Sequence, residues 1–271
     1  MTKRKKLDKK DEDFFRAIFK FFMFIVKIPY YIFKLIATLL KKSKEIVDKE
    51  KVDIKRKKMS SVYSKFKDIK IEKGNYRNFE KNIFNSDSKI GVILGSRGSG
   101  KTAFALRFLE NFHSLKKRGI FALGFNEKEM PDWINVVSDI SKIKNNSFVL
   151  IDEGGILFSS RNAMSSANKL LSELILIARH KNLNILFISQ NSSNLDVNIL
   201  RQADFLVLKP SSFLQKDFER KIIQKIYDKI SDYFEKIDDK GKTYIYSDIF
   251  KGFVSSPLPS FWKTEISKSF K

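Results

Sequence analysis

Cysteine is absent from the 271-residue chain, and histidine occurs only at His113 and His180. Without cysteine the protein has no disulfide framework and no metal site built from thiolates. Two histidines are too few for a histidine-based zinc cluster. A chain without disulfides fits a reducing cytoplasmic compartment.

Acidic residues are outnumbered by basic ones, and the formal net charge is +22. The excess is uneven, because residues 1–70 hold 22 Lys and Arg against 9 Asp and Glu. Such a charge favours a polyanionic neighbour, either nucleic acid or an anionic membrane surface. A lysine-rich proteome of low genomic GC content would produce the same charge, so charge alone does not decide between these explanations.

Residues 14–40 form an almost entirely apolar stretch, interrupted by the cations Arg16, Lys20, Lys27 and Lys34. At about 100° per residue, these cations share one narrow face of a helix. The cations, and the lack of a small-residue cleavage site, exclude a cleavable signal peptide. Three arrangements remain open: a helix lying in the membrane interface, a helix spanning the membrane, and a helix docked on the protein or on another copy.

Residues 95–102 match the phosphate-binding pattern G-x-x-x-x-G-K-[ST]. An apolar run precedes the pattern and a helical rhythm follows it, which is the context that the motif requires. The glycines let successive backbone N–H groups face a phosphate chain, and the start of the helix adds positive partial charge. We expect Lys101 to reach the β- and γ-phosphates of ATP and Thr102 to bind Mg²⁺. The expected nucleotide-binding residues are Gly95, Ser96, Arg97, Gly98, Ser99, Gly100, Lys101 and Thr102.

A second apolar run, residues 148–151, ends in the carboxylates Asp152 and Glu153. A buried parallel strand requires such a run, and parallel sheets present their ligands at the carboxyl ends of strands. Asp152 is therefore predicted to hold Mg²⁺, and Glu153 to activate the attacking water. The sequence thus predicts an ATPase with ATP and Mg²⁺ in its site.

A third apolar run, residues 184–189, ends in Gln190. We expect Gln190 to contact the γ-phosphate and to couple hydrolysis to movement; the alternative is an amide that merely caps the strand. Elsewhere the patterns predict strands at 68–73, 120–125, 204–208 and 242–246, helices at 131–143 and 215–237, a loop-rich lead-in at 74–88 and a packed arm at 257–262. The predicted fold class is α/β with a mainly parallel central sheet.

The order of these motifs resembles the FtsK/HerA superfamily of P-loop motor ATPases. Within it, the chain is similar to the zonular-occludens-toxin-like and viral genome-packaging ATPases of archaea and phages. The resemblance covers residues 89–210 and rests on segments 95–102, 148–153, 178–183, 188–191 and 200–204.

The resemblance implies a RecA-like core, a homo-oligomeric ring (often a hexamer) and ATP hydrolysis at subunit interfaces. It also implies an arginine finger from the neighbouring subunit. Arg179 is the first candidate for this role, followed by Arg201 and Arg161. A separate DNA-guiding domain is not found in the sequence.

Other P-loop classes fit less well. The Leu-Ser-Gly-Gly-Gln signature of ABC transporters is missing, and so is the Asn-Lys-x-Asp motif of GTPases. A small-molecule kinase would rarely need an Asp-Glu pair positioned for water.

The predicted domain organisation has three parts. Residues 1–45 form a basic N-terminus with a membrane-associating helix, residues 46–88 a charged linker and lead-in, and residues 89–271 the ATPase domain.

Two functions remain open. One is a motor that translocates or packages DNA at the cytoplasmic face of a membrane; the other is a membrane-bound ATPase that drives protein or filamentous-virion assembly or export without stimulation by DNA.

Overall fold

The structure, a computed structural model, describes residues 14–16, 19–20, 34, 36, 38–40, 58–154 and 163–267. The chain divides into two compact units, Met1–Lys55 and Arg56–Lys271. Most of the hydrophobic stretch predicted as a helix, residues 14–40, lies outside the described residues; those of it that are described are helical and exposed. Among the described residues, no helix has the length and apolarity needed to cross a bilayer.

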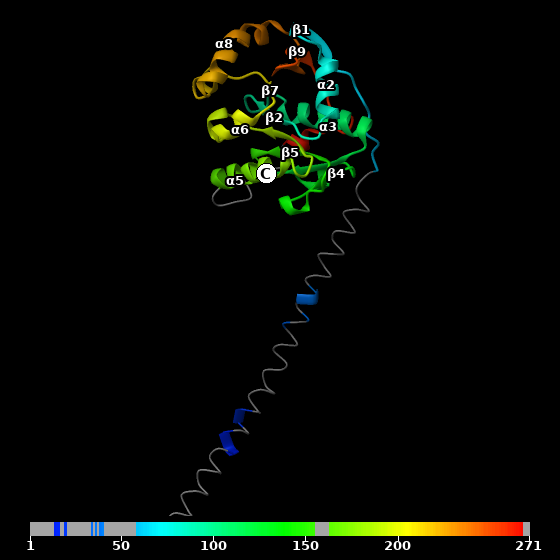
Figure 1. The fold of residues 1–271 in the computed structure, drawn as a ribbon, viewed down its shortest axis with the longest axis vertical. Coiled ribbons are helices and arrows are strands. Elements are labelled where there is room, and N and C mark those ends of the chain that lie inside the picture. Colours follow the sequence, from blue (N-terminus) through cyan, green and yellow to red (C-terminus); the bar gives the residue numbers. More distant parts are fainter. Residues whose placement is uncertain are drawn as a thin grey trace, which may run out of the picture. The chain divides into compact units, whose positions relative to one another are not determined.

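Within the described part of the second unit, nine strands form one mixed sheet (Figure 1). The strand order is β1-β9-β8-β7-β2-β6-β5-β3-β4. The strands from β7 to β4 in this order are parallel, and β8, β9 and β1 extend the sheet through antiparallel pairs. The strands are β1 (Lys67–Lys73), β2 (Ile90–Leu94), β3 (Gly119–Leu123), β4 (Ile134–Val136), β5 (Ser147–Asp152), β6 (Asn184–Ile188), β7 (Phe205–Leu208), β8 (Lys242–Ser247) and β9 (Lys251–Ser255). The predicted α/β class with a mainly parallel sheet is confirmed.

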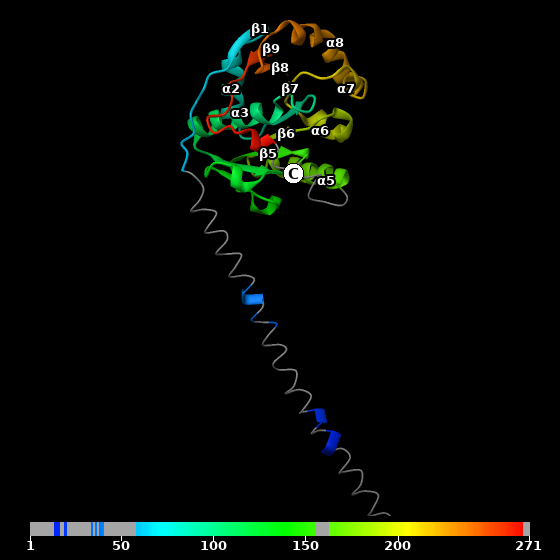
Figure 2. The ribbon, with the colours of Figure 1, turned by 180° about the vertical axis from the view of Figure 1, so that it is seen from behind.

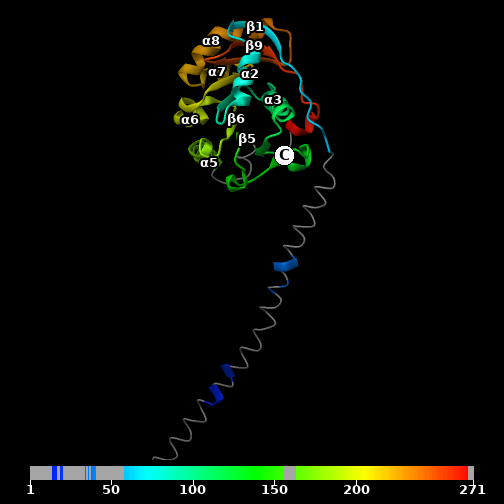
Figure 3. The same ribbon diagram turned by 45° about the vertical axis from the view of Figure 1, so that its right-hand side comes forward.

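Helices cover both faces of the sheet (Figure 2). The α-helices are α2 (Tyr76–Asn85), α3 (Lys101–Lys116), α5 (Ala163–Ala178), α6 (Val197–Gln202), α7 (Phe213–Asp217) and α8 (Lys221–Lys236). Short 3₁₀ helices are η1 (Glu127–Glu129), η2 (Ile140–Lys142), η3 (Ser192–Asn194) and η4 (Thr264–Ser267). Buried side chains of α2 and α3 share one apolar core, and those of α5, α6 and α8 share the other (Figure 3).

Alternation along the central strands explains why the apolar runs are unbroken. Phe148 and Leu150 of β5 enter the core beneath α2 and α3, whereas Val149 and Ile151 enter the opposite core. Because both faces are covered, successive positions between the ends of these strands are apolar. The core beneath α2 and α3 is rich in aromatic contacts, such as Phe112 on Phe148 with ring centroids 4.9 Å apart.

Three predicted segments differ from the structure. The helix predicted at 131–143 is wrong, since the segment holds strand β4, which pairs with β3, and the 3₁₀ helix η2. The helix predicted at 215–237 is interrupted at residues 218–220, between α7 and α8. The lead-in predicted at 74–88 contains helix α2, which begins after the cap Asn75. The three-part domain division stays a prediction.

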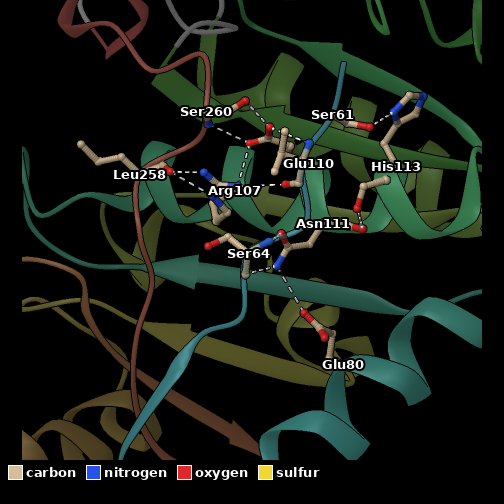
Figure 4. Close-up of polar contacts among 11 residues, drawn as sticks. Ser61, Ser64, Glu80, Arg107, Glu110, Asn111, His113, Leu258 and Ser260 are labelled. Atoms are coloured by element: carbon tan, nitrogen blue, oxygen red, sulfur yellow. Dashed lines mark hydrogen bonds and ion pairs between the residues drawn. The ribbon is translucent and has the colours of Figure 1, made fainter. Parts of the chain in front are cut away.

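A buried polar cluster on α3 holds two segments that lie outside the helices and strands, residues 58–66 and 257–262 (Figure 4). Asn111 and Ser64 exchange two hydrogen bonds, of 2.9 and 2.8 Å. The Glu110 carboxylate accepts from the backbone N–H of Val62 at 3.1 Å and of Ser260 at 2.9 Å. The α3 helix is therefore fastened to the segment before β1 and to the arm after β9.

Arg107 completes this cluster through a buried ion pair with Glu110, with 3.0 Å between nitrogen and oxygen. Its guanidinium also donates to the carbonyls of Val62 and Leu258. The charges are satisfied within the cluster, so the two segments are held by specific polar contacts and not by apolar packing alone.

We predict that Glu110→Ala lowers the free energy of unfolding by about 3 kcal/mol, because it leaves the Arg107 charge buried without its ion-pair partner. Urea unfolding followed by circular dichroism measures the effect. Glu235→Ala, at an exposed position of α8, is the matched control. Equal stability of the two variants would contradict the role assigned to this cluster.

Candidate nucleotide-binding site

The phosphate loop, residues 95–100, joins β2 to α3 at the carboxyl edge of the parallel strands. Gly95, Gly98 and Gly100 have positive φ values of 148°, 76° and 91°. A Cβ on Gly95 would lie 2.7 Å from the Cβ of Lys209, whereas a Cβ on Gly98 would meet nothing within 4 Å. Gly95 is thus required by close packing as well as by conformation, and Gly98 by conformation alone.

Lys101 is the first residue of α3, and its side chain lies back across the phosphate loop. Its Nζ donates to the carbonyls of Gly95 at 2.8 Å and Ser96 at 2.9 Å. Burial lowers the pKa of Lys101 to about 8, and the carboxylates of Asp152, Glu153 and Glu219 act in the opposite direction. The loop thus holds a cation where an anionic phosphate would bind.

Asp152 and Thr102 come together from two different elements. The Thr102 hydroxyl donates to Asp152 Oδ2 at 3.5 Å, and the backbone N–H of Gly154 donates to Oδ1 at 3.0 Å. Burial raises the pKa of Asp152 to about 6. A hydroxyl and a carboxylate facing each other beside a phosphate loop are oxygen donors of the kind that Mg²⁺ takes.

The described residues contain no group of three or more acidic or histidine side chains able to hold a metal ion by themselves. Thr102 and Asp152 therefore fit a magnesium ion that also binds phosphate oxygens and water, as is usual for this ion.

Glu153 is buried, with 4% of its surface exposed, and points toward the end of β6. Its carboxylate accepts a hydrogen bond from the Ser189 hydroxyl. Burial raises the pKa of Glu153, while hydrogen bonds from Ser189, the Gln190 backbone and the Asn194 side chain act against this rise. A carboxylate with a raised pKa beside a phosphate site is suited to accept a proton from water.

Gln190 follows β6, the strand between the phosphate-loop strand β2 and the Asp152 strand β5. It is exposed, and its carbonyl accepts a hydrogen bond from the Gln215 side chain. A cleft beside the phosphate loop is lined by Ser96, Arg97, Gln190, Asn191, Asn194, Ser212, Leu214, Gln215 and Phe218. The structure therefore brings Gln190 to the phosphate loop, as the sequence predicts; its role as a sensor stays a prediction.

The candidate arginines lie elsewhere. Arg179 is exposed and follows α5, just before β6 begins, so it lies at the edge of the sheet opposite the phosphate loop. Arg201, in the last turn of α6, precedes β7 in the same way. Arg161 lies outside the described residues. At that edge, Arg179 and Arg201 are remote from the nucleotide site of their own chain and could serve only the site of a second copy.

Lys209 was not anticipated from the sequence, although it lies directly beneath the phosphate loop. Its side chain is 1% exposed, and Nζ donates to the Gly241 carbonyl at 3.2 Å, the Lys242 carbonyl at 3.0 Å and the Thr243 hydroxyl at 2.8 Å. Lys209 follows β7, so the strand-end rule that identified Asp152 and Gln190 also points to it.

Glu219 is a second buried charge that the sequence patterns do not reveal. It is 4% exposed and lies in the break between α7 and α8, where the sequence predicts a continuous helix. Its charge and that of Lys101 influence each other. Hydrophobic periodicity could not identify Glu219, because the residues that bury it come from distant parts of the chain.

The sequence has no match among protein-family models or among curated proteins. Among solved structures, the chain is similar to the DNA-packaging ATPase B204 from Sulfolobus Turreted Icosahedral Virus, at 15% identity and a TM-score of 0.43, over 64% of this chain and 99% of that one. It is also similar to EssC (ATPases 2 and 3) from Geobacillus thermodenitrificans, at 12% identity and a TM-score of 0.43, over 79% of this chain and 49% of that one.

A third similar structure is the N-terminal domain of zonular occludens toxin from Neisseria meningitidis, at 17% identity and a TM-score of 0.31, over 45% of this chain and 76% of that one. The resemblance to FtsK/HerA-type P-loop ATPases stays a prediction from the sequence motifs. At such identities no residue's role follows from it.

We predict that Lys209→Met lowers the free energy of unfolding by about 3 kcal/mol at pH 7, because three buried acceptors lose their donor. Thermal unfolding measures the loss, with Lys240→Met at an exposed position as the control.

The loss should also depend on pH. Burial lowers the pKa of Lys209 to about 7; Asp239 opposes this shift and Lys242 adds to it. Between that value and its ordinary pKa, the unfolded chain binds a proton that the folded chain does not, so the stability of the wild type rises with pH by up to about 1.4 kcal/mol per unit. Lys209→Met lacks this gain, so the difference in the free energy of unfolding between the wild type and the variant should grow from pH 7 to 9. A difference that stays constant over this range would contradict the assignment.

Proposed function

We propose that this protein is an ATP-hydrolysing motor that moves DNA, with Mg²⁺ as its cofactor. The observation on which the proposal rests is the meeting of Thr102 and Asp152, 3.5 Å apart, at the phosphate loop that holds Lys101. Thr102 lies in the first turn of α3 and Asp152 at the end of β5, which β6 separates from β2. Their contact supports a site for a phosphate chain and its cation.

The chain's own residues divide the work of hydrolysis. Inward-facing N–H groups of the phosphate loop and the Lys101 ammonium hold the β- and γ-phosphates. Thr102 and Asp152 would hold Mg²⁺, and the ion would neutralise charge developing on the phosphates. Glu153 accepts the proton of the attacking water on a carboxylate oxygen, and the Ser189 hydroxyl, which donates to Oε2, holds the carboxylate in place.

Among the described residues, the candidate finger arginines Arg179 and Arg201 lie at the edge of the sheet away from the nucleotide site of their own chain. We propose that Arg179 of a second copy supplies positive charge at the γ-phosphate within a ring-shaped oligomer. The exposed position of Arg179 at the opposite edge of its own sheet supports this role. Both the number of subunits and a hexameric arrangement stay predictions.

The formal net charge of +22, together with the motif order that resembles the FtsK/HerA motor ATPases, supports DNA as the proposed substrate. A basic protein attracts DNA through the phosphates, which carry negative charge along the whole length of the DNA. The second candidate is an ATPase that drives protein or filamentous-virion assembly or export, favoured by the apolar stretch at residues 14–40. Association with a membrane through this stretch stays a prediction, since most of it lies outside the described residues.

We predict that Lys101→Ala abolishes ATP binding and hydrolysis, and that Glu153→Gln retains ATP binding but lowers kcat by about 10²–10³-fold. Phosphate release and binding of a fluorescent ATP analogue measure the two effects. Lys128→Ala and Glu235→Gln, both at exposed positions, are the matched controls. Hydrolysis at the wild-type rate by Lys101→Ala would show that the nucleotide binds elsewhere.

We predict that double-stranded DNA stimulates ATP hydrolysis by the full chain, and that the stimulation fades as salt rises from about 50 to 200 mM, because phosphate contacts release counterions. Steady-state hydrolysis with and without DNA measures this. Hydrolysis that is indifferent to DNA at every salt concentration would favour the assembly or export machine.

A further inference from the structure

The break between α7 and α8, residues 218–220, is fastened to the loop that follows β6. Arg220 donates from its backbone N–H to the Ser192 hydroxyl at 2.9 Å and from Nε to the Ser192 carbonyl at 3.0 Å. The Ser193 hydroxyl donates to the Phe218 carbonyl. The loop begins with Ser189 and Gln190, so the break is in contact with the segment that carries the expected sensor.

Glu219 lies at the centre of this contact. One carboxylate oxygen, Oε2, accepts the backbone N–H of Ser192 at 2.7 Å. The other, Oε1, is buried and meets no donor at hydrogen-bond geometry among the described residues, although the Ser192 and Gln215 side chains lie near enough to the carboxylate to lower its pKa against the rise that burial causes. Within the described part of the chain, no ion pair within 4 Å balances its charge.

A buried carboxylate with an unpaired oxygen costs free energy, so stability does not explain it. Phe218, the residue before Glu219, lines the cleft beside the phosphate loop, which places Glu219 on the side of the nucleotide. In agreement with this position, the charges of Lys101 and Glu219 act on each other's pKa. A buried polar group without a full set of hydrogen-bond partners calls for a functional explanation.

We propose that Glu219 is a further positioning residue of the ATPase site, which fixes the loop after β6 through Ser192 and so holds Gln190 beside the phosphate loop. The inference rests on the proposed ATPase function. Glu219 does not touch the reacting atoms; it acts by holding Ser192, two residues after Gln190. Ser189, which donates to Glu153, is held separately, because its backbone N–H donates to the Ile93 carbonyl at 2.9 Å.

Substitutions at Glu219 in the full chain test the proposal through kcat and KM for ATP. Glu219→Ala removes the acceptor of the Ser192 N–H and should lower kcat about 10-fold or more, with KM changed by less than about threefold. Glu219→Gln keeps an acceptor oxygen at the same place and should retain kcat within about threefold. Asp217→Asn, an exposed carboxylate two residues away, should match the wild type.

A double-mutant cycle separates positioning from mere loss of structure. If Glu219 acts through Gln190, Glu219→Ala combined with Gln190→Ala should be no slower than Gln190→Ala alone. If the two defects multiply instead, Glu219 does not act through Gln190 and the proposal is overturned.

Where Glu219→Ala does not fold, Glu219→Asp takes its place, since the shorter side chain keeps the charge but withdraws from Ser192. Glu219→Asp should then lower kcat relative to Glu219→Gln. Equal and wild-type rates for Glu219→Asp and Glu219→Gln would overturn the inference while leaving the ATPase intact. A wild-type chain that does not hydrolyse ATP would instead overturn the proposed function, and this inference with it.

Discussion

A loop that binds phosphate must turn its backbone N–H groups inward, and its backbone must rest on a rigid support to keep them there. Here that support is Lys209, whose side chain packs under Gly95 and Gly100 and whose ammonium is bound by three oxygens around residues 241–243. One buried amine thus joins the phosphate loop, the end of β7 and the start of β8. The glycines leave room for the Lys209 side chain, and the start of β8 supplies the oxygens that bind its amine.

The site gathers charges that a stable core would avoid. Lys101, Asp152, Glu153 and Glu219 are all buried, and burial shifts each pKa toward the neutral form. Their mutual attraction offsets only part of this cost, since Lys101 bonds to loop carbonyls and not to a carboxylate. A phosphate chain with its cation would bring an opposite charge to Lys101 and to Asp152, which supports the proposed nucleotide site.

The sequence predicted the parts of the molecule that local patterns determine. The apolar runs that became β2, β5 and β6 were clear because both faces of these strands are covered, and the phosphate loop has a fixed pattern. The edge strand β4 was wrongly predicted as a helix. It has three residues and one buried side chain, so it is too short to show the alternation that identifies a strand. Glu219 could not be predicted, because its partner Ser192 is 27 residues away and meets it only after folding.

The polar cluster on α3 gives the phosphate loop a second connection. Lys101 and Thr102 begin this helix, and Arg107, Glu110 and Asn111 on the same helix bind the segments at 58–66 and 257–262. A helix moves as a rigid body, because its hydrogen bonds fix one turn to the next. A displacement of Lys101 toward or away from phosphate therefore reaches both segments through side chains two to three turns along the helix. The α3 helix thus joins the phosphate loop to the two segments that its polar side chains bind.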